Sequence, residues 1–176
     1  MRTFWGLARF VLAAVAISFA LEAKVQSDDK AKASRLDALK RLAGDWVGTI
    51  KHGSNEHEAT VNYKVTSGGS AVVETLLAGT EHEMVTVFYE DGDDLVLTHY
   101  CMLHNQPHMR AKGTGAADKL EFKFDGGTNI KSDKDQHMHD LTLQILSDDH
   151  IKAAWTMYKD GKKMDTATLD LKRKKT

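Results

Sequence analysis

The stretch MVTVFYEDGDDLVLTHYC, residues 84–101, contains two short runs of similar character on either side of a turn. Both runs are rich in β-branched and aromatic residues, which suit the pleated surface of a strand. The segment between them, EDGDD, places Gly92 among acidic residues, a composition typical of a tight turn. The stretch therefore predicts two adjacent antiparallel strands.

The same pattern repeats on both sides of this hairpin, from Trp46 to the end of the chain. About ten strands are expected, with the sequences DWVGTIKH, ATVNYKV, AVVETLL, MVTVFYE, LVLTHYC, HMRAKG, KLEFKFD, HDLTLQIL, IKAAWTMY and TATLDLK. Turn sequences such as SGGS, GTGAAD, SDD and KDGKK separate them. Closing such a meander removes its two unpaired edges. We predict an all-β fold, a closed up-and-down antiparallel β-barrel of about ten strands over residues 44–176.

The N-terminal residues 1–23 have the features of a secretory signal peptide. Arg2 and Arg9 precede an apolar run over residues 10–19, and small residues follow. The apolar run is shorter than the ~20 residues that cross a bilayer. We expect cleavage after Ala20 or Ala23, an exported protein that is periplasmic or secreted, and no stable membrane insertion after cleavage. An uncleaved membrane anchor is the alternative.

Residues 24–43 form a separate segment that is predicted to contain one amphipathic helix. In DDKAKASRLDALKRLA, residues 28–43, the apolar residues recur at the spacing of one helix face: Ala33, Leu36, Leu39 and Leu42. Gly44 is expected to end the helix. The helix is predicted to pack against one end of the barrel.

Charge and cysteine content limit the classes of partner. Loss of Arg2 and Arg9 takes the formal net charge from −1 to −3. A balanced, slightly acidic chain argues against a nucleic-acid partner, which favours a basic face. Cys101 is the single cysteine, so an exported chain has no internal disulfide. No oligomeric state is indicated.

Three features of the chain resemble the calycin superfamily, which includes the lipocalins. Gly44-Asp45-Trp46 opens the first predicted strand as the Gly-x-Trp element does in that superfamily. A basic residue at the end of the last strand, Lys172 or Arg173, would lie over the tryptophan, as the resemblance implies. With the N-terminal helix, the chain looks like uncharacterised secreted bacterial lipocalin-like proteins. Ten strands fit the fatty-acid-binding or nitrobindin-like branch better than the eight of true lipocalins.

The connections between strands predict which end of the barrel is open. Those after even-numbered strands are compact, and most of those after odd-numbered strands are longer. Eight of the nine histidines fall at or beside the longer connections, and one, His150, falls at the other end. The end with the longer connections is therefore predicted to be an open, imidazole-lined mouth.

Alternation along two strands selects the candidate ligands within that mouth. His99 and Cys101 share a strand face with Leu95 and Leu97. His137 and His139 are expected to share a face with Leu141, Leu143 and Ile145. Because zinc and copper sites use His and Cys, we predict a transition-metal site of His99, Cys101, His137 and His139. Strands five and eight are not neighbours, so these pairs meet only if the barrel is narrow or a ligand spans the gap.

Three further residues are candidates for contact with a ligand. Met109 offers a thioether or simply fills space, and His82 lies beside the mouth. Glu74 interrupts VVETLL, and an inward carboxylate would need a cation, hydrogen bonds or a raised pKa. An outward Glu74 would be only a solvated residue, and we favour that orientation.

Two functions fit these patterns. The first is an exported carrier or sensor whose mouth binds a small ligand, with haem or a divalent transition metal such as Zn²⁺ as candidates. The second is a metal-dependent or histidine-assisted hydrolase or isomerase at the same mouth. No P-loop, Gly-x-Ser-x-Gly or His-Glu-x-x-His motif is present, so an enzyme is the less favoured hypothesis.

Overall fold

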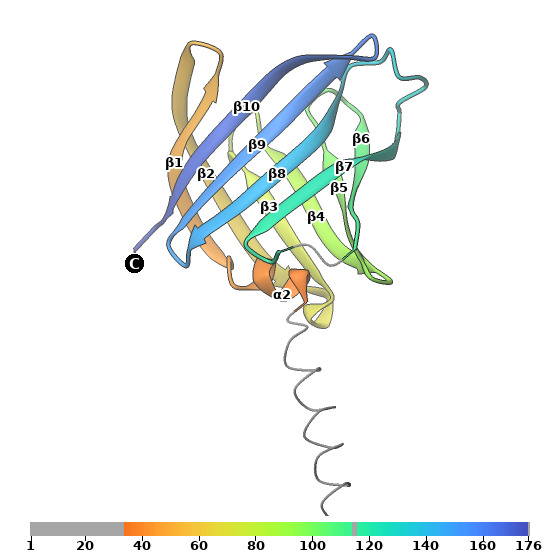
Figure 1. Cartoon of the computed structure of the whole chain (residues 1–176). Helices are drawn as coiled ribbons and strands as arrows, with labels where there is room; N and C mark the ends of the chain where they lie inside the picture. Colours follow the sequence, from red (N-terminus) through yellow and green to blue (C-terminus); the bar gives the residue numbers. More distant parts are fainter. Residues whose placement is uncertain (1–33, 114–115, 176) are drawn as a thin grey trace, which may run out of the picture. The chain divides into compact units, whose positions relative to one another are not determined.

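The computed structural model describes residues 34–113 and 116–175, which form a closed barrel of ten antiparallel strands with a short helix at one end (Figure 1). Each strand pairs with its neighbours in the sequence, and β1 closes the barrel by pairing with β10. The predicted fold class is confirmed. The predicted signal peptide and its cleavage site lie outside the described residues.

The strands follow the predicted segments closely. The helix is α2 (Arg35–Lys40), and η1 (Ser67–Gly69) is a single 3-10 turn between β2 and β3. The strands are β1 (Gly44–His52), β2 (Asn55–Thr66), β3 (Ala71–Leu76), β4 (Met84–Asp91), β5 (Asp94–Tyr100), β6 (Gln106–Ala111), β7 (Lys119–Thr128), β8 (His137–Ser147), β9 (His150–Lys159) and β10 (Lys162–Arg173).

Alternation along the strands places an apolar core inside the barrel. Leu95 and Leu97 of β5 and Leu141 and Leu143 of β8 are buried, as the period of two requires. The aromatic rings of Phe88 and Phe122 meet across this interior with their centroids 5.7 Å apart. The interior is therefore packed along most of its length.

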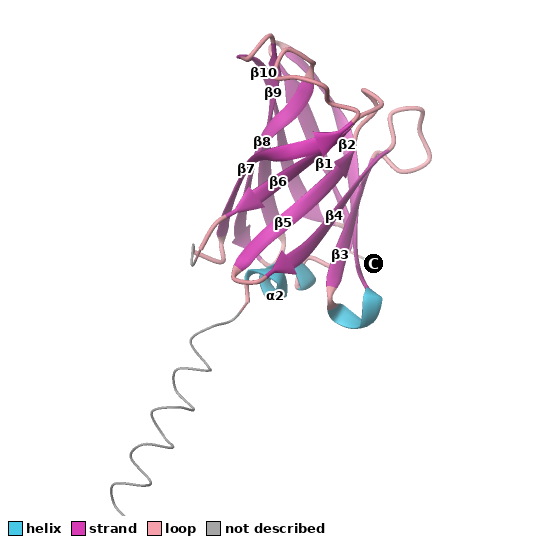
Figure 2. Cartoon of the chain, turned by 90° about the vertical axis from the view of Figure 1, so that its right-hand side faces the viewer, coloured by secondary structure: helices cyan, strands magenta, loops and turns pink. Residues whose placement is uncertain are grey.

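The helix α2 closes one end of the barrel (Figure 2). Its Leu36 and Leu39, with Leu42 just beyond it, belong to the same core as the strands. The Ser34 side chain caps the first turn by accepting a hydrogen bond from the backbone N–H of Asp37. The predicted packing of a helix against one end is thus observed.

The helix ends earlier than predicted, at Lys40 rather than at Gly44. The carbonyl groups that follow it bind side chains instead of continuing the helical ladder. The indole Nε1 of Trp46 donates to the carbonyl of Leu42 at 2.8 Å, and Arg173 donates to the carbonyls of Arg41 and Ala43. Residues 28–33 of the predicted helix lie outside the described residues.

Arg173, rather than Lys172, is the basic residue that lies over Trp46. Its guanidinium carbon is 4.4 Å from the centre of the fully buried indole ring. The same guanidinium donates to three carbonyl oxygens, those of Arg41, Ala43 and Asp148, each at 2.8 Å. One side chain therefore joins the end of β10 to the segment between α2 and β1.

We expect Arg173→Ala to lower the free energy of unfolding by about 2 kcal/mol. The estimate combines a cation–π contact with hydrogen bonds from a charged donor. Arg173→Lys should recover part of this loss, because it restores the charge but not the three-way donation. Chemical denaturation measures the effect. The control is Lys172→Ala at an exposed neighbouring position, which should change stability by less than about 0.5 kcal/mol. A larger effect at Lys172 than at Arg173 would contradict the assignment.

In the part of the chain that the structure describes, no helix has the length and apolar character needed to cross a membrane.

Candidate functional site

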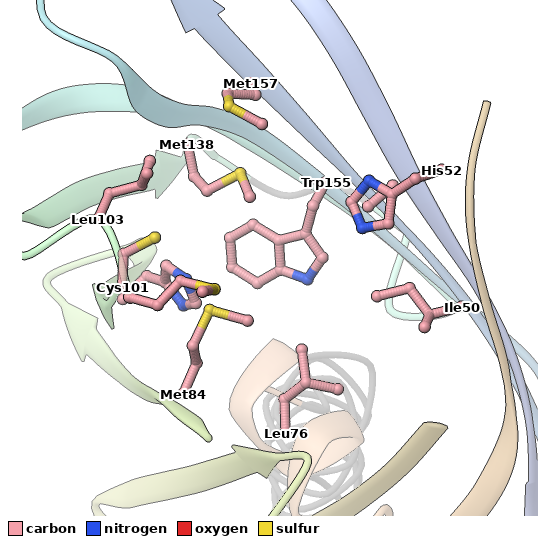
Figure 3. Close-up of a pocket in the computed structure, with 12 residues that line it drawn as sticks. Ile50, His52, Leu76, Met84, Cys101, Leu103, Met138, Trp155 and Met157 are labelled. Atoms are coloured by element: carbon pink, nitrogen blue, oxygen red, sulfur yellow. The ribbon is translucent and has the colours of Figure 1, made fainter. Parts of the chain in front are cut away.

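A pocket of about 150 Å³ lies at the end of the barrel opposite α2 (Figure 3). Its lining comes from the ends of β1, β3, β5 and β9, from the starts of β4, β8 and β10, and from the connection between β5 and β6. This is the end that the longer connections and the histidines predict to be open.

The pocket is mainly apolar and rich in sulfur. Five of its side chains carry sulfur: Met84, Cys101, Met102, Met138 and Met157. The others are Ile50, His52, Leu76, His99, Leu103, Trp155 and Ala167. The two imidazoles and the Trp155 indole are thus the groups best suited to form strong hydrogen bonds with a bound molecule.

His99 is the buried polar group of the pocket. Its side chain is 2% exposed, and its ring lies on the indole of Trp155 with the centroids 4.6 Å apart. The ring Nδ1 is 3.0 Å from the hydroxyl of Thr86, whereas Nε2 is buried without a hydrogen-bond partner. A buried polar atom without a partner costs free energy, so Nε2 is a natural contact for a ligand.

The orientation of His99 is set by a row of polar side chains across four strands. Tyr63 of β2 pairs with Glu74 of β3, Glu74 with Thr86 of β4, and Thr86 with His99 of β5. The Tyr63 hydroxyl donates to one Glu74 carboxylate oxygen at 2.5 Å, and the Thr86 hydroxyl donates to the other at 3.2 Å. All four side chains are buried. We call these four residues the polar row.

Burial shifts the pKa values of the polar row. It lowers the pKa of His99 from 6.5 to about 4, so the imidazole is neutral at physiological pH. Burial also raises the pKa of Glu74, and the hydrogen bonds from Tyr63 and Thr86 partly oppose that shift. The pKa of Tyr63 is held well above its usual 10.0 by burial and then by the Glu74 carboxylate.

The single proton of the Thr86 hydroxyl determines which tautomer of His99 faces the pocket. While that hydroxyl donates to an ionised Glu74, it accepts from His99, and Nδ1 must carry the ring proton. The Nε2 atom then has a free lone pair. The polar row therefore leaves Nε2 of this pocket-lining residue as an acceptor, or a metal-binding nitrogen, without a partner.

Cys101 and His52 also line the pocket, and they differ in burial and in their contacts. Cys101 is a free, buried thiol whose pKa is raised by burial. His52 is more exposed, and its Nδ1 is 3.5 Å from a carboxylate oxygen of Asp165. Cys101 is one of the predicted site residues, whereas His52 was not selected as one.

The predicted inward orientation of His137 and His139 is not observed. Neither residue is among those that line the pocket, and Met138 between them is. An irregularity in the pairing of β8 with β9, between Met138 and Asp140, shifts the alternation by one residue. Strict alternation counted back from Leu141 therefore assigns His137 and His139 to the wrong face of β8.

His137 and His139 instead pack among aromatic rings. The His137 ring lies 4.4 Å from that of Phe124, and the His139 ring stacks on that of Tyr158 at 3.9 Å. The Nδ1 atoms of the two histidines contact the backbone carbonyl of Asp135 and the carboxylate of Asp140. Like His99, His137 is 2% exposed and its Nε2 is buried without a hydrogen-bond partner, but His137 does not line the pocket.

The predicted convergence of His99, Cys101, His137 and His139 on one metal ion is therefore wrong for this arrangement. Within residues 34–113 and 116–175, no three His, Cys, Asp or Glu side chains gather so that they could hold a metal. The four side chains do not meet because β5 and β8 are not neighbours: β6 and β7 lie between them in the barrel.

The other three candidates have different environments. Glu74 is 6% exposed and belongs to the polar row, so the outward orientation that we favoured is wrong. Met109 is fully buried in the core and fills space there. His82 is exposed, with its Nε2 3.7 Å from a carboxylate oxygen of Glu81.

The sequence analysis did not identify Tyr63, Thr86 or the pocket methionines as site residues. Part of the evidence was nevertheless present in the alternation of polar and apolar residues along β3 and β4. Thr86 alternates with buried Phe88, and Glu74 alternates with buried Val72 and Leu76. This alternation places both polar residues inside. It does not give the register between strands, which brings Tyr63 opposite Glu74.

Several solved structures resemble the barrel, whereas no family model and no curated protein sequence matches the chain. Rv2717c from M. tuberculosis superposes with a TM-score of 0.57 at 16% identity, over 81% of this chain and 99% of that one. A protein of unknown function of the DUF3598 family from Nostoc punctiforme gives 0.53 at 9% identity, over 77% of this chain and 48% of that one. The S-type phycobiliprotein lyase CPES from Guillardia theta gives 0.41 at 11% identity, over 80% and 92%, a likeness too weak to bear on the ligand.

The chain thus has a calycin-like, or lipocalin-like, barrel fold. The closed antiparallel topology of ten strands fits that fold, and the two better-matched structures superpose on this barrel. The Gly44-Asp45-Trp46 element and Arg173 occupy the positions that the resemblance implied.

Proposed function

We propose that this chain is an exported carrier or sensor that binds a small, mainly apolar ligand in the pocket at the open end of the barrel. One observation carries the proposal: a neutral, buried His99 lines an apolar pocket, and its Nε2 atom lacks a hydrogen-bond partner. A ligand that fills the pocket and donates one hydrogen bond would remove the cost of that buried acceptor.

The size of the pocket limits the ligand. An apolar cavity of about 150 Å³ can hold a molecule of the size of benzene. Pockets for drug-sized ligands are about 300–1,000 Å³. Haem is at least of that size, so it does not fit between Met138, Trp155 and Leu76 as these side chains lie. Haem is therefore too large for this pocket, and a divalent metal has no set of three His, Cys, Asp or Glu ligands among the described residues.

The proposal predicts that phenol binds more tightly than benzene. Both probes fit the pocket, but phenol also donates a hydrogen bond to His99 Nε2. A net gain of about 1 kcal/mol corresponds to roughly fivefold tighter binding. Calorimetric titration gives both affinities, and fluorescence of Trp155 reports binding at the pocket. Equal affinity for the two probes would contradict the role of His99.

The matched control fills the pocket from a position away from the polar row. Ala167 of β10 lines the pocket, and Ala167→Leu should abolish binding of both probes while the β-sheet circular dichroism spectrum is retained. A folded wild-type protein that binds neither probe would refute the small-ligand proposal. Retention of binding in Ala167→Leu would place the probes elsewhere.

One observation favours the second candidate, a histidine-assisted hydrolase or isomerase. The polar row orients a neutral imidazole in the way that a general base is oriented. Glutamine forms hydrogen bonds but does not take up a proton at neutral pH. A carrier should therefore tolerate His99→Gln with a modest loss of affinity, whereas an enzyme should lose turnover on a substrate panel and keep binding.

A further inference from the structure

Sulfur is concentrated in the pocket beyond what its apolar character requires. Four of the seven methionines of the chain and its single cysteine line this one cavity. They come from four separate places in the fold: the start of β4, the β5–β6 connection, the start of β8 and the end of β9. Figure 3 shows the side chains of Met84, Cys101 and Met138 directed into the same space.

The sulfurs differ in their availability. The thioether of Met157 already accepts a hydrogen bond from Gln136 Nε2, and Met102 is 50% exposed. Met84 and Met138 are partly buried and pack against the core, and Cys101 is a free, buried thiol. Among the described residues, no hydrogen bond from another side chain is recorded for these three sulfurs, and the Cys101 sulfur accepts hydrogen bonds from the backbone N–H groups of Leu103 and Met102.

His99 provides the observation that points to a ligand rather than to simple packing. Methionine alone would be read as a flexible apolar lining. His99 lines the same pocket, its imidazole is buried and oriented through Nδ1, and its Nε2 has no hydrogen-bond partner. A hydrogen bond to the other ring nitrogen is the arrangement that commonly supports a metal-bound histidine.

We propose that the pocket binds one soft monovalent metal ion, Cu(I), through His99 Nε2, the Cys101 sulfur and the thioethers of Met84 and Met138. Thiolate and thioether ligands select Cu(I), whereas Mg²⁺ and Ca²⁺ need the oxygen ligands that this pocket lacks. The Cys101 thiol gives up its proton to the solvent when its sulfur binds the ion.

This inference names a ligand class for the pocket of the proposed function, and it rests on that pocket being accessible. It differs from the four-residue site predicted from the sequence in both ligands and metal. His137 and His139 take no part, and the thioethers replace them. A metal site of this kind does not need three His, Cys, Asp or Glu side chains, because two of its four ligands are methionine.

The test is a competition for Cu(I) between the purified protein and the chromophoric chelator bathocuproine disulfonate, without oxygen and with ascorbate. Titration with Ag(I), which does not change its oxidation state, provides a second measurement by calorimetry and native mass spectrometry. We expect one ion of either metal per chain, with quenching of Trp155 fluorescence. Zn²⁺ should bind at least about 100-fold more weakly.

Variants assign the ligands. Cys101→Ser and His99→Gln should each weaken Cu(I) binding by at least about tenfold, and the double variant Met84→Leu/Met138→Leu should do the same. Methionine and leucine have similar volumes, so the double variant should keep the barrel folded. The matched control is Met164→Leu, because Met164 lies on β10 with 55% exposure and does not line the pocket. It should bind Cu(I) as the wild type does.

Three outcomes would overturn the inference: no Cu(I) or Ag(I) bound at one equivalent, Zn²⁺ bound as tightly as Ag(I), or wild-type affinity in the double methionine variant. Phenol binding measured on the same samples separates the two proposals. Phenol binding without metal binding removes only the metal inference. Loss of both, in a folded protein, removes the pocket as a ligand site altogether.

Discussion

Replacing Gly48 with alanine should destabilise the barrel by about 3 kcal/mol or more, at or above the upper end of the typical range for overpacking. A Cβ atom at Gly48 would stand 2.0 Å from the carbonyl oxygen of Asp170 and 3.0 Å from the Cα of Leu171. Both neighbours are backbone atoms of β10, which no side-chain rotation can move away. The cost is therefore steric, because the backbone of Gly48 does not require a positive φ.

The position of Gly48 makes this steric cost affect the whole fold. It lies opposite Leu171 in the pairing of β1 with β10, the pair that joins the two ends of the meander. Separation of β1 from β10 would expose two strand edges and open the core near Trp46. An open meander with two edges is also prone to pair with other chains.

Chemical denaturation of Gly48→Ala measures this prediction, with the light scattering of the native sample as a second readout. The control is Gly53→Asn in the β1–β2 turn. A Cβ there meets nothing within 4 Å, and asparagine tolerates the positive φ of 53°. Gly53→Asn should cost about 1 kcal/mol or less. If Gly48→Ala is as stable as Gly53→Asn, the close approach of β1 and β10 is wrong.

The sequence predicts the barrel because short-range signals repeat along it. The hairpin at residues 84–101 forms as expected, with β4 and β5 joined by a tight turn around Gly92. Trp46 and Arg173 meet as the resemblance implied. The connections β3–β4, β5–β6 and β7–β8 lie at the end that contains the pocket and are long, as expected, whereas β1–β2 and β9–β10 at that end are two-residue turns and β6–β7 at the other end is long. These features depend on local composition and on topology, both of which a single sequence carries.

The site is predicted less well, because it depends on register and on one irregular residue in β8. His99 and Cys101 lie in the predicted place, since β5 alternates regularly. Because of the bulge between Met138 and Asp140, Met138 lines the pocket, and His137 and His139 do not. Glu74 is oriented inward, where partners on both neighbouring strands compensate for its burial. Alternation within one strand does not reveal those partners.

Acid should destabilise the wild-type protein more than a His99→Gln variant. Burial lowers the pKa of His99 from 6.5 to about 4 in the folded protein. The unfolded chain therefore takes up a proton at this side chain as the pH falls below 6.5, while the folded chain does not until about pH 4. Stability that is present above pH 6.5 is lost through that window. The shift corresponds to about 3 kcal/mol.

Glu74 acts in the opposite direction, and its contribution can be separated. Its pKa is raised by burial, so its ionised form is disfavoured in the folded protein. The stability associated with this raised pKa is present at low pH and is lost as the pH rises through the folded pKa. Glu74→Gln removes this opposing effect and should make the acid-induced loss steeper than in the wild type.

Urea denaturation at several pH values between 7 and 4 measures both effects. The wild-type curve should fall by about 3 kcal/mol more than the curve of His99→Gln, because other carboxylates and histidines contribute equally to both. His82→Gln is the matched control, since His82 is exposed and should leave the slope unchanged. If the curves of wild type and His99→Gln are parallel, His99 is protonated as easily in the folded barrel as in water. The burial of His99, on which both ligand proposals depend, would then be contradicted.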